Sequence, residues 1–367
     1  MEPWTHPITL KALYGRELAR SFMRFRNPRR RASGRFHTAF YQSTWREAAA
    51  KMGGTWTSLG SGIGEIELNG RRTRVMDNVS EIDGPVTLAV LHDKPMVHRI
   101  LREEGVAVPR HAAFSMSDVA PAMAFMRSIA SDCVVKPAGG TGGGRGVTTG
   151  IRTTAQLARA TAIASVYGDD LMIEEQLAGE NYRLLFLDGE MIDAFVRRLP
   201  SVVGDGAKSI GQLVKDLNEH RLMNGSDISQ VLLTVDYDMR RTLAKQNLTM
   251  GSVPEAGRVV TVKTVVNENG GSDNATAMQL LCPSIVHDCK RAVDRLRVRF
   301  AGIDIVTPDP TVPLAEAGGA VLEVNGTPNL YYHYKKKDGE FPVALRLLSK
   351  LLCDVAVVGA GVGEMVR

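Results

Sequence analysis

The sequence is poor in cysteine and has no long uncharged apolar run. Its four cysteines include no CxxC pair. We interpret them as reduced thiols in a reducing compartment, and a catalytic Cys–His pair stays open. No stretch approaches the roughly 20 apolar residues that a membrane helix needs. Residues 1–10 lack the apolar core of a signal peptide. We therefore expect a cytoplasmic protein without a transmembrane segment.

The basic residues are concentrated at the N-terminus. Residues 1–36 carry a net charge of +7, whereas the whole chain is only +5. The body is thus slightly acidic and is not a basic nucleic-acid binder. Two interpretations of the arm at 24–35 stay open: a solvated tail, or a contact with something anionic such as a partner protein, a membrane surface or an acidic substrate.

The N-terminal half alternates short elements, and the length suits two or three domains. Apolar spacing predicts an amphipathic helix over 10–25. Asn69-Gly70 is typical of a hairpin turn between strands, and Asp93 can cap a helix over 93–104. The expected strands are 55–59, 64–68, 72–76, 86–91, 133–136, 146–151 and 171–175, and helices are expected over 45–52 and from Thr153 or Thr154 to 167.

The C-terminal half has no strict βαβ rhythm. We expect strands over 183–187, 191–197, 258–266, 303–306 and 321–324, and helices over 210–218, 283–299 and 343–352. An α+β body with an α/β N-terminal piece fits this order better than one doubly wound sheet.

A glycine-rich loop follows the strand that ends at Lys136-Pro137. Six glycines fall within the nine residues 138–146: Gly139, Gly140, Gly142, Gly143, Gly144 and Gly146. Backbone N–H groups of such a loop can approach phosphate oxygens closely. It is not a Walker A loop, because no Lys-Ser/Thr closes it and a strand follows. The alternative is an ordinary hairpin loop, although Lys136 at its base favours an anion site.

Oxygen ligands alternate along two late strands. In a strand, Glu323 and Asn325 share one face, and Asp304 has the same alternation. Paired antiparallel, the strands would bring all three together as hard ligands for Mg²⁺. The alternative is a solvated polar sheet face.

Two weaker signals complete the set. The strand ending at Glu174-Glu175 could pair its backbone with a planar base, although an ordinary strand end is the simpler interpretation. Arg183 and Arg198 could meet a developing negative charge, or they could be surface charges.

Taken in order, these segments resemble the ATP-grasp superfamily. The likeness is greatest to the ATP-grasp portion of cyanophycin synthetases, and weaker to bacterial glutathione synthetase and D-alanine–D-alanine ligase. It runs from about residue 40 to 352, through 93–109, 134–146, 197–206, 252–257 and the two segments 302–305 and 323–325.

The resemblance implies an ATP-grasp fold of three subdomains, with ATP in the cleft between the central and C-terminal ones. The implied division is a basic arm over 1–36, an N-terminal α/β domain over 37–92, a central domain over 93–172 and a C-terminal domain over 173–367.

The resemblance also implies residue roles. Lys94 and Lys136 would contact the ATP phosphates under the glycine loop. Glu174, with Glu175 and Leu177, would hold adenine, and Asn181 stands where an acid is expected near the ribose. The implied ligands of two Mg²⁺ ions, with Mn²⁺ as the other suitable ion, are Asp304, Glu323 and Asn325, and the implied catalytic cations are Arg198 and Arg183.

The implied activity is ATP-dependent joining of a carboxylate to an amine through an acyl phosphate. Cyanophycin synthetases carry further domains that this sequence does not show, so we expect a ligase of amino acids or short peptides, with a homodimer as one open oligomeric state. The alternatives are a non-catalytic nucleotide-binding module recruited by its basic arm and a small-molecule kinase on the same fold.

Overall fold

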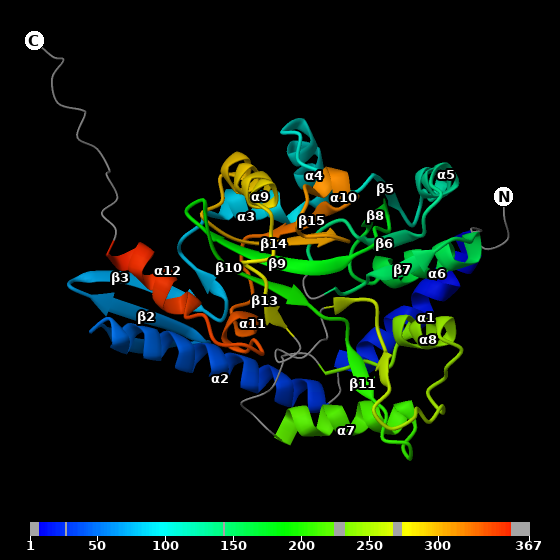
Figure 1. Cartoon of the computed structure of the whole chain (residues 1–367), viewed down its shortest axis with the longest axis horizontal. Coiled ribbons are helices and arrows are strands. Elements are labelled where there is room, and N and C mark those ends of the chain that lie inside the picture. The colour runs from blue at the N-terminus through cyan, green and yellow to red at the C-terminus, as the bar shows by residue number, and fades with distance from the viewer. Residues whose placement is uncertain (1–6, 26–27, 142–143, 224–231, 267–273, 354–367) are drawn as a thin grey trace, which may run out of the picture.

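The computed structural model describes residues 7–25, 28–141, 144–223, 232–266 and 274–353. Three bodies of secondary structure follow one another along the chain (Figure 1). Within the described residues, no helix combines the length and the apolar character needed to cross a bilayer.

The N-terminal body is a long helix packed on a small antiparallel sheet. Its elements are α1 (Pro7–Phe25), α2 (Pro28–Lys51), β1 (Thr55–Gly60), β2 (Ile63–Leu68), β3 (Arg71–Met76), β4 (Val79–Ser80) and α3 (Pro85–His92). The sheet order is β1-β2-β3-β4. Asn69 and Gly70 both have positive φ, which confirms the predicted hairpin turn.

The predicted strand over 86–91 is wrong, because these residues form helix α3. A short apolar run fits a buried strand and a buried helix equally well. Pro85 in the first turn fits the helix, since its ring fixes φ and its missing N–H would have no intrahelical partner there.

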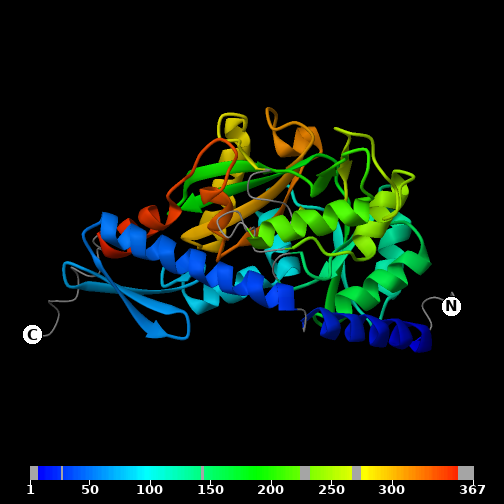
Figure 2. The same cartoon turned by 90° about the horizontal axis from the view of Figure 1, so that it is seen from below.

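Helix α1 is not an isolated tail. It packs along α6 of the central body, with Leu10 buried, and Figure 2 shows α1 and α2 along the same side of the molecule. The helix predicted over 10–25 is confirmed.

The central body has a four-stranded antiparallel sheet with the order β5-β8-β6-β7. Its elements are α4 (Lys94–Glu103), β5 (His111–Ser115), α5 (Ala120–Ser128), β6 (Cys133–Pro137), β7 (Thr148–Ile151), α6 (Thr154–Ser165) and β8 (Asp170–Glu175). Both predicted helix caps are confirmed. Asp93 accepts from the N–H of Met96 at 2.9 Å, and Thr153 forms a capping box with Gln156.

The C-terminal body has a five-stranded antiparallel sheet with the order β13-β10-β9-β14-β15. Its strands are β9 (Glu180–Leu187), β10 (Glu190–Arg197), β13 (Ala275–Thr276), β14 (Phe300–Thr307) and β15 (Ala320–Asn325), and its helices are α9 (Pro283–Leu296), α10 (Leu314–Ala317), α11 (Tyr331–Tyr334) and α12 (Val343–Leu352). Helices α3, α4 and α9 cover one face of the sheet with an apolar cluster.

A smaller unit lies between β10 and β13. It consists of β11 (Ser201–Val203), α7 (Ile210–Met223), α8 (Tyr237–Lys245) and β12 (Val259–Thr261) around its own apolar cluster. The strand expected over 258–266 is therefore limited to three residues. The mixed α/β architecture predicted from the sequence is confirmed, whereas the domain boundaries stay a prediction.

Candidate active site

A cavity of about 290 Å³ lies between the central and the C-terminal sheet. Most of the predicted site residues line it, namely Lys94, Lys136, Gly144, Glu174, Glu175, Leu177, Asn181, Asp304 and Glu323. Residues that are far apart in the sequence thus share one cleft. Among the predicted residues with described positions, Gly139, Gly140, Gly146, Arg183, Arg198 and Asn325 are not part of its lining.

The two lysines reach the cavity from the central body, and each is buried and paired with a carboxylate. Nζ of Lys94, in the first turn of α4, is 3.1 Å from Glu323 Oε1. Nζ of Lys136, on β6, is 2.8 Å from Glu174 Oε1. An ammonium group has three hydrogens, so each lysine keeps donors for an anionic ligand while its charge is balanced.

Strand register explains the polar face of the C-terminal sheet. Arg183 lies opposite Asp304 in the β9–β14 pair, and Asp304 lies opposite Glu323 in the β14–β15 pair. Arg197 lies opposite Asn181, two residues from Arg183 on β9. Since side chains two apart share a face, these groups all point to the same side, as predicted for Asp304 and Glu323.

Asp304 is held between two arginines, the buried Arg197 and the partly buried Arg183. Arg183 donates to both its oxygens, at 2.5 and 2.8 Å, and Arg197 Nη1 donates at 3.4 Å. Burial raises the pKa of Asp304, but the two guanidinium groups outweigh it and hold that pKa below its usual value. The carboxylate therefore stays ionised at the floor of the cavity.

The three expected metal ligands differ in availability. Glu323 is partly exposed, beside Lys94. Asn325 donates through Nδ2 to the carbonyl of Gly302 at 3.3 Å, which leaves its amide oxygen as an acceptor. Two carboxylates and an amide oxygen fit a hard cation such as Mg²⁺. No cluster of three or more His, Cys, Asp or Glu side chains suited to a metal occurs in the part of the chain that is described.

Neighbouring arginines at the end of β10 lie in different surroundings. Arg197 is buried, lines the cavity and faces the ring of Tyr332, with its guanidinium 5.9 Å from the ring centre. Arg198 is exposed and pairs with Glu180. The structure thus brings Arg197, and not Arg198, together with Asp304 and Glu323.

The edge expected to hold adenine is partly engaged already. The N–H of Glu175 donates to the carbonyl of Arg110 at 3.0 Å, and the Glu175 carboxylate accepts from the N–H of Arg110 at 2.8 Å. Leu177 is the next lining residue beyond Gln176. Glu174 Oε2 is buried without a partner among the described residues, so this edge retains one acceptor.

The glycine loop contributes Thr141 and Gly144 to the lining of the cavity. Gly142 and Gly143 lie outside the described residues. At Gly139 a Cβ would stand 2.5 Å from the carbonyl oxygen of His92, and Gly146 has φ of +79°. The sequence therefore requires glycine for close approach at one end of the loop and for its backbone conformation at the other.

Several lining residues carried no signal in the sequence. Thr149, Gln176 and Thr264 line the cavity, but a hydroxyl or an amide in an apolar strand is common. Arg197 could have been found from alternation along β10 only if the end of that strand had been known.

Comparison with known proteins supports the same superfamily. No family model matches the chain. Cyanophycin synthetase from Trichormus variabilis is 26% identical over 296 residues, which cover 79% of this chain and 32% of that protein. The glutathione biosynthesis bifunctional protein GshAB from Listeria innocua is 28% identical over 263 residues, 70% of this chain and 33% of that protein. The chain thus spans about a third of the length of these relatives.

A solved structure shows the shared fold. The bifunctional glutathione synthetase from Pasteurella multocida superposes with a TM-score of 0.55 at 20% identity, over 84% of this chain and 43% of that one. The chain therefore has the predicted ATP-grasp fold, and its resemblance to the ATP-grasp ligases is confirmed.

Proposed function

We propose that this chain is an ADP-forming carboxylate–amine ligase that makes an amide bond through an acyl phosphate, with amino acids or short peptides as substrates. One observation carries the proposal: Lys94 and Lys136 converge with Glu323 and Asp304 on one cavity between two sheets. The relatives named above support the activity.

In this proposal the central body holds the nucleotide. Lys94 and Lys136 contact the phosphates, and the loop from Gly139 to Gly146 covers them. Glu174 and the backbone near Leu177 hold adenine, and Asn181 is placed for the ribose. Mg²⁺, with Mn²⁺ as a substitute, would be held by Glu323, Asn325 and Asp304 and would neutralise charge on the β- and γ-phosphates.

The reaction has two steps. An oxygen of the substrate carboxylate attacks the γ-phosphorus, and ADP leaves. The amine nitrogen then attacks the acyl carbon, phosphate leaves, and the nitrogen loses a proton. Both steps build negative charge on oxygen, and a preorganised cation stabilises that charge. We assign this role to Arg197, because it is buried at the cavity, whereas Arg198 is the alternative from the sequence pattern.

The test is ADP release by the full chain with Mg²⁺ and pairs of amino acids or dipeptides. Mass spectrometry should find the condensed product, and added hydroxylamine should trap the acyl phosphate as a hydroxamate. Glu323→Gln should abolish turnover in folded protein. ATP binding without turnover would indicate a binding module, and a stable phosphorylated product without condensation would indicate a kinase. Cytoplasmic location and a homodimer stay predictions.

A further inference from the structure

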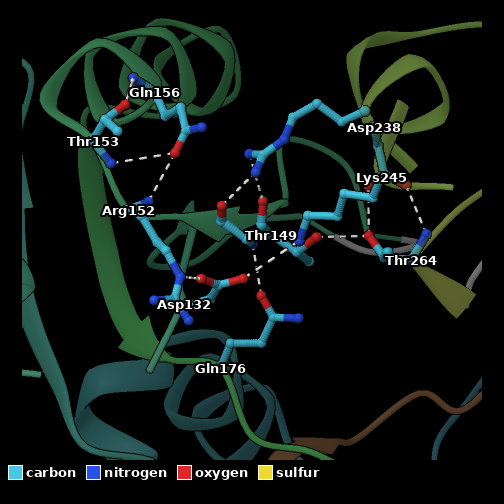
Figure 3. Close-up of polar contacts among 11 residues, drawn as sticks. Asp132, Thr149, Arg152, Thr153, Gln156, Gln176, Asp238, Lys245 and Thr264 are labelled. Carbon is cyan, nitrogen blue, oxygen red and sulfur yellow. Dashed lines mark hydrogen bonds and ion pairs between the residues drawn. The ribbon is translucent and has the colours of Figure 1, made fainter. Parts of the chain in front are cut away.

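Two threonines join the walls of the nucleotide cavity. Thr149 comes from β7, the strand that follows the glycine loop, and Thr264 lies just after β12; both line the cavity. Their hydroxyl oxygens are 2.6 Å apart (Figure 3). This contact joins a strand of the central body to the smaller unit that contains α8.

Helix α8 holds one partner of this contact. Asp238, in the first turn of α8, accepts from the N–H of Thr264 at 3.0 Å and from its hydroxyl at 2.5 Å. A hydroxyl has only one hydrogen, so Thr264 is the acceptor in its bond with Thr149. The direction of the whole chain of hydrogen bonds is therefore set by the Asp238 carboxylate.

The same helix holds the other partner. Arg241 donates through Nη1 to the carbonyl of Thr149 at 3.0 Å and through Nη2 to the carbonyl of Gly150. One guanidinium group thus spans two consecutive carbonyls in the middle of β7. Such charge-assisted bonds are among the stronger hydrogen bonds in proteins.

Gly150 links this helix to the edge expected to hold adenine. Its N–H donates to Oε1 of Gln176 at 2.6 Å, and Gln176 lines the cavity. Because the Gly150 carbonyl also accepts from Arg241, both backbone polar groups of Gly150 are hydrogen-bonded. A Cβ at Gly150 would stand 2.7 Å from Lys245 Nζ and 3.0 Å from Arg241 Nη2. Gly150 also has a φ of +68°, a backbone conformation that favours glycine.

No residue of α8 lines the cavity, yet α8 fixes the positions of Thr149, Thr264 and, through Gly150, Gln176. We propose that Arg241 is a positioning residue of the nucleotide site, which keeps the β7 wall in register with Gln176 and Thr264 and thereby sets the affinity for ATP. The inference rests on the proposed function.

Loss of the guanidinium leaves the carbonyls of Thr149 and Gly150 without their donor. Strand β7 should then move away from Gln176, so the cavity must be re-formed whenever ATP binds. Since hydrogen bonds to charged groups are stronger than neutral ones, we expect the KM for ATP of Arg241→Ala to rise on the order of ten-fold or more. The kcat should change much less, because Arg197 and Glu323 lie on the other sheet.

The experiment uses the full chain and compares Arg241→Ala with Arg240→Ala. Arg240 is the neighbouring residue, is exposed and points about 100° away around the helix. Steady-state kinetics give KM and kcat separately, and hydrogen exchange reports on residues 144–151. Arg241→Gln, which can still donate to one carbonyl, should give an intermediate KM and keeps the test open if the alanine variant misfolds.

A raised KM with faster exchange at 144–151 in Arg241→Ala, and neither in Arg240→Ala, is the expected result. An unchanged KM in folded Arg241→Ala, or equal effects of both variants, overturns the inference. A lower melting temperature with an unchanged KM would show a merely structural role and also overturns it. Failure of the unmodified chain to bind ATP would instead count against the proposed function.

Discussion

Removal of the buried carboxylate of Asp193 should be among the most destabilising single changes in the C-terminal body. Asp193 is 1% exposed, and its two oxygens meet Nδ1 of His333 at 2.6 Å and Nζ of Lys336 at 2.7 Å. Burial raises the pKa of Asp193, but its partners outweigh that effect and hold the pKa below its usual value. The carboxylate is thus the counter-ion of a buried ammonium.

The size of the loss in folding stability depends on what happens to Lys336 when Asp193 is removed. In Asp193→Ala its side chain, 5% exposed, would keep an unpaired buried charge, which costs about 3–5 kcal/mol. The free energy of unfolding should therefore fall by about 3–5 kcal/mol in this variant.

Equilibrium urea unfolding, followed by the fluorescence of the buried Trp45, measures this loss. Asp294→Ala is the control, because its ion pair with Lys290 is exposed and should contribute under about 1 kcal/mol. Asp193→Ala/Lys336→Met should regain most of the stability, since the unpaired charge is gone. A loss under about 1 kcal/mol for Asp193→Ala, or a larger loss for the double variant, would refute this reasoning.

Two further predictions concern the site, and a third concerns the dependence of stability on pH. Arg197→Ala should lower kcat about 10²–10³-fold while Arg198→Ala stays near the unmodified rate; the reverse result in steady-state assays would return the role to Arg198. Hydrogen exchange at Gly139–Thr141 and Gly144–Gly146 should slow when ATP and Mg²⁺ are added, and unchanged exchange would argue against phosphate contact there. Burial, with a contribution from Lys136, lowers the pKa of His98 to about 3. The unfolded chain therefore binds a proton that the folded chain does not, so stability should fall by about 1.4 kcal/mol per pH unit from about pH 6 toward pH 3, and His98→Gln should flatten that slope in urea titrations.

The pair of strands that carries the expected metal ligands was predictable from the sequence. In Leu322–Asn325, apolar and polar residues alternate, and so they do in Ile303–Ile305. This alternation matches a sheet with one face on an apolar cluster and the other on a polar site. The structure pairs Asp304 with Glu323 as expected. This could be predicted because the alternation within each strand already shows which of its residues share a face.

Contacts between bodies were not predictable in the same way. The apolar spacing of α1 indicated a helix but not a partner, and only the fold brings α1 against α6. The contact of Arg241 with Thr149 likewise joins residues 92 positions apart. A single arginine on a polar helix face carries no local mark that distinguishes it from its exposed neighbour Arg240, because the difference depends on tertiary placement.

The choice between Arg197 and Arg198 shows where alternation along a strand stops being informative. Strand β10 is buried on both faces over its second half, with Ala194 and Val196 on the helix-covered side and Phe195 on the other. Because hydrophobic residues occupy consecutive positions, the sequence pattern does not show to which face of the sheet the next side chain points. A register shift between Met191 and Asp193 further uncouples the end of the strand from the hairpin turn that begins it. Only the pairing with β9 resolves the choice. Arg197 is the last paired residue of β10, lies opposite Asn181, and therefore shares the face of Asp304. Arg198 lies beyond the paired residues and forms an ion pair with Glu180.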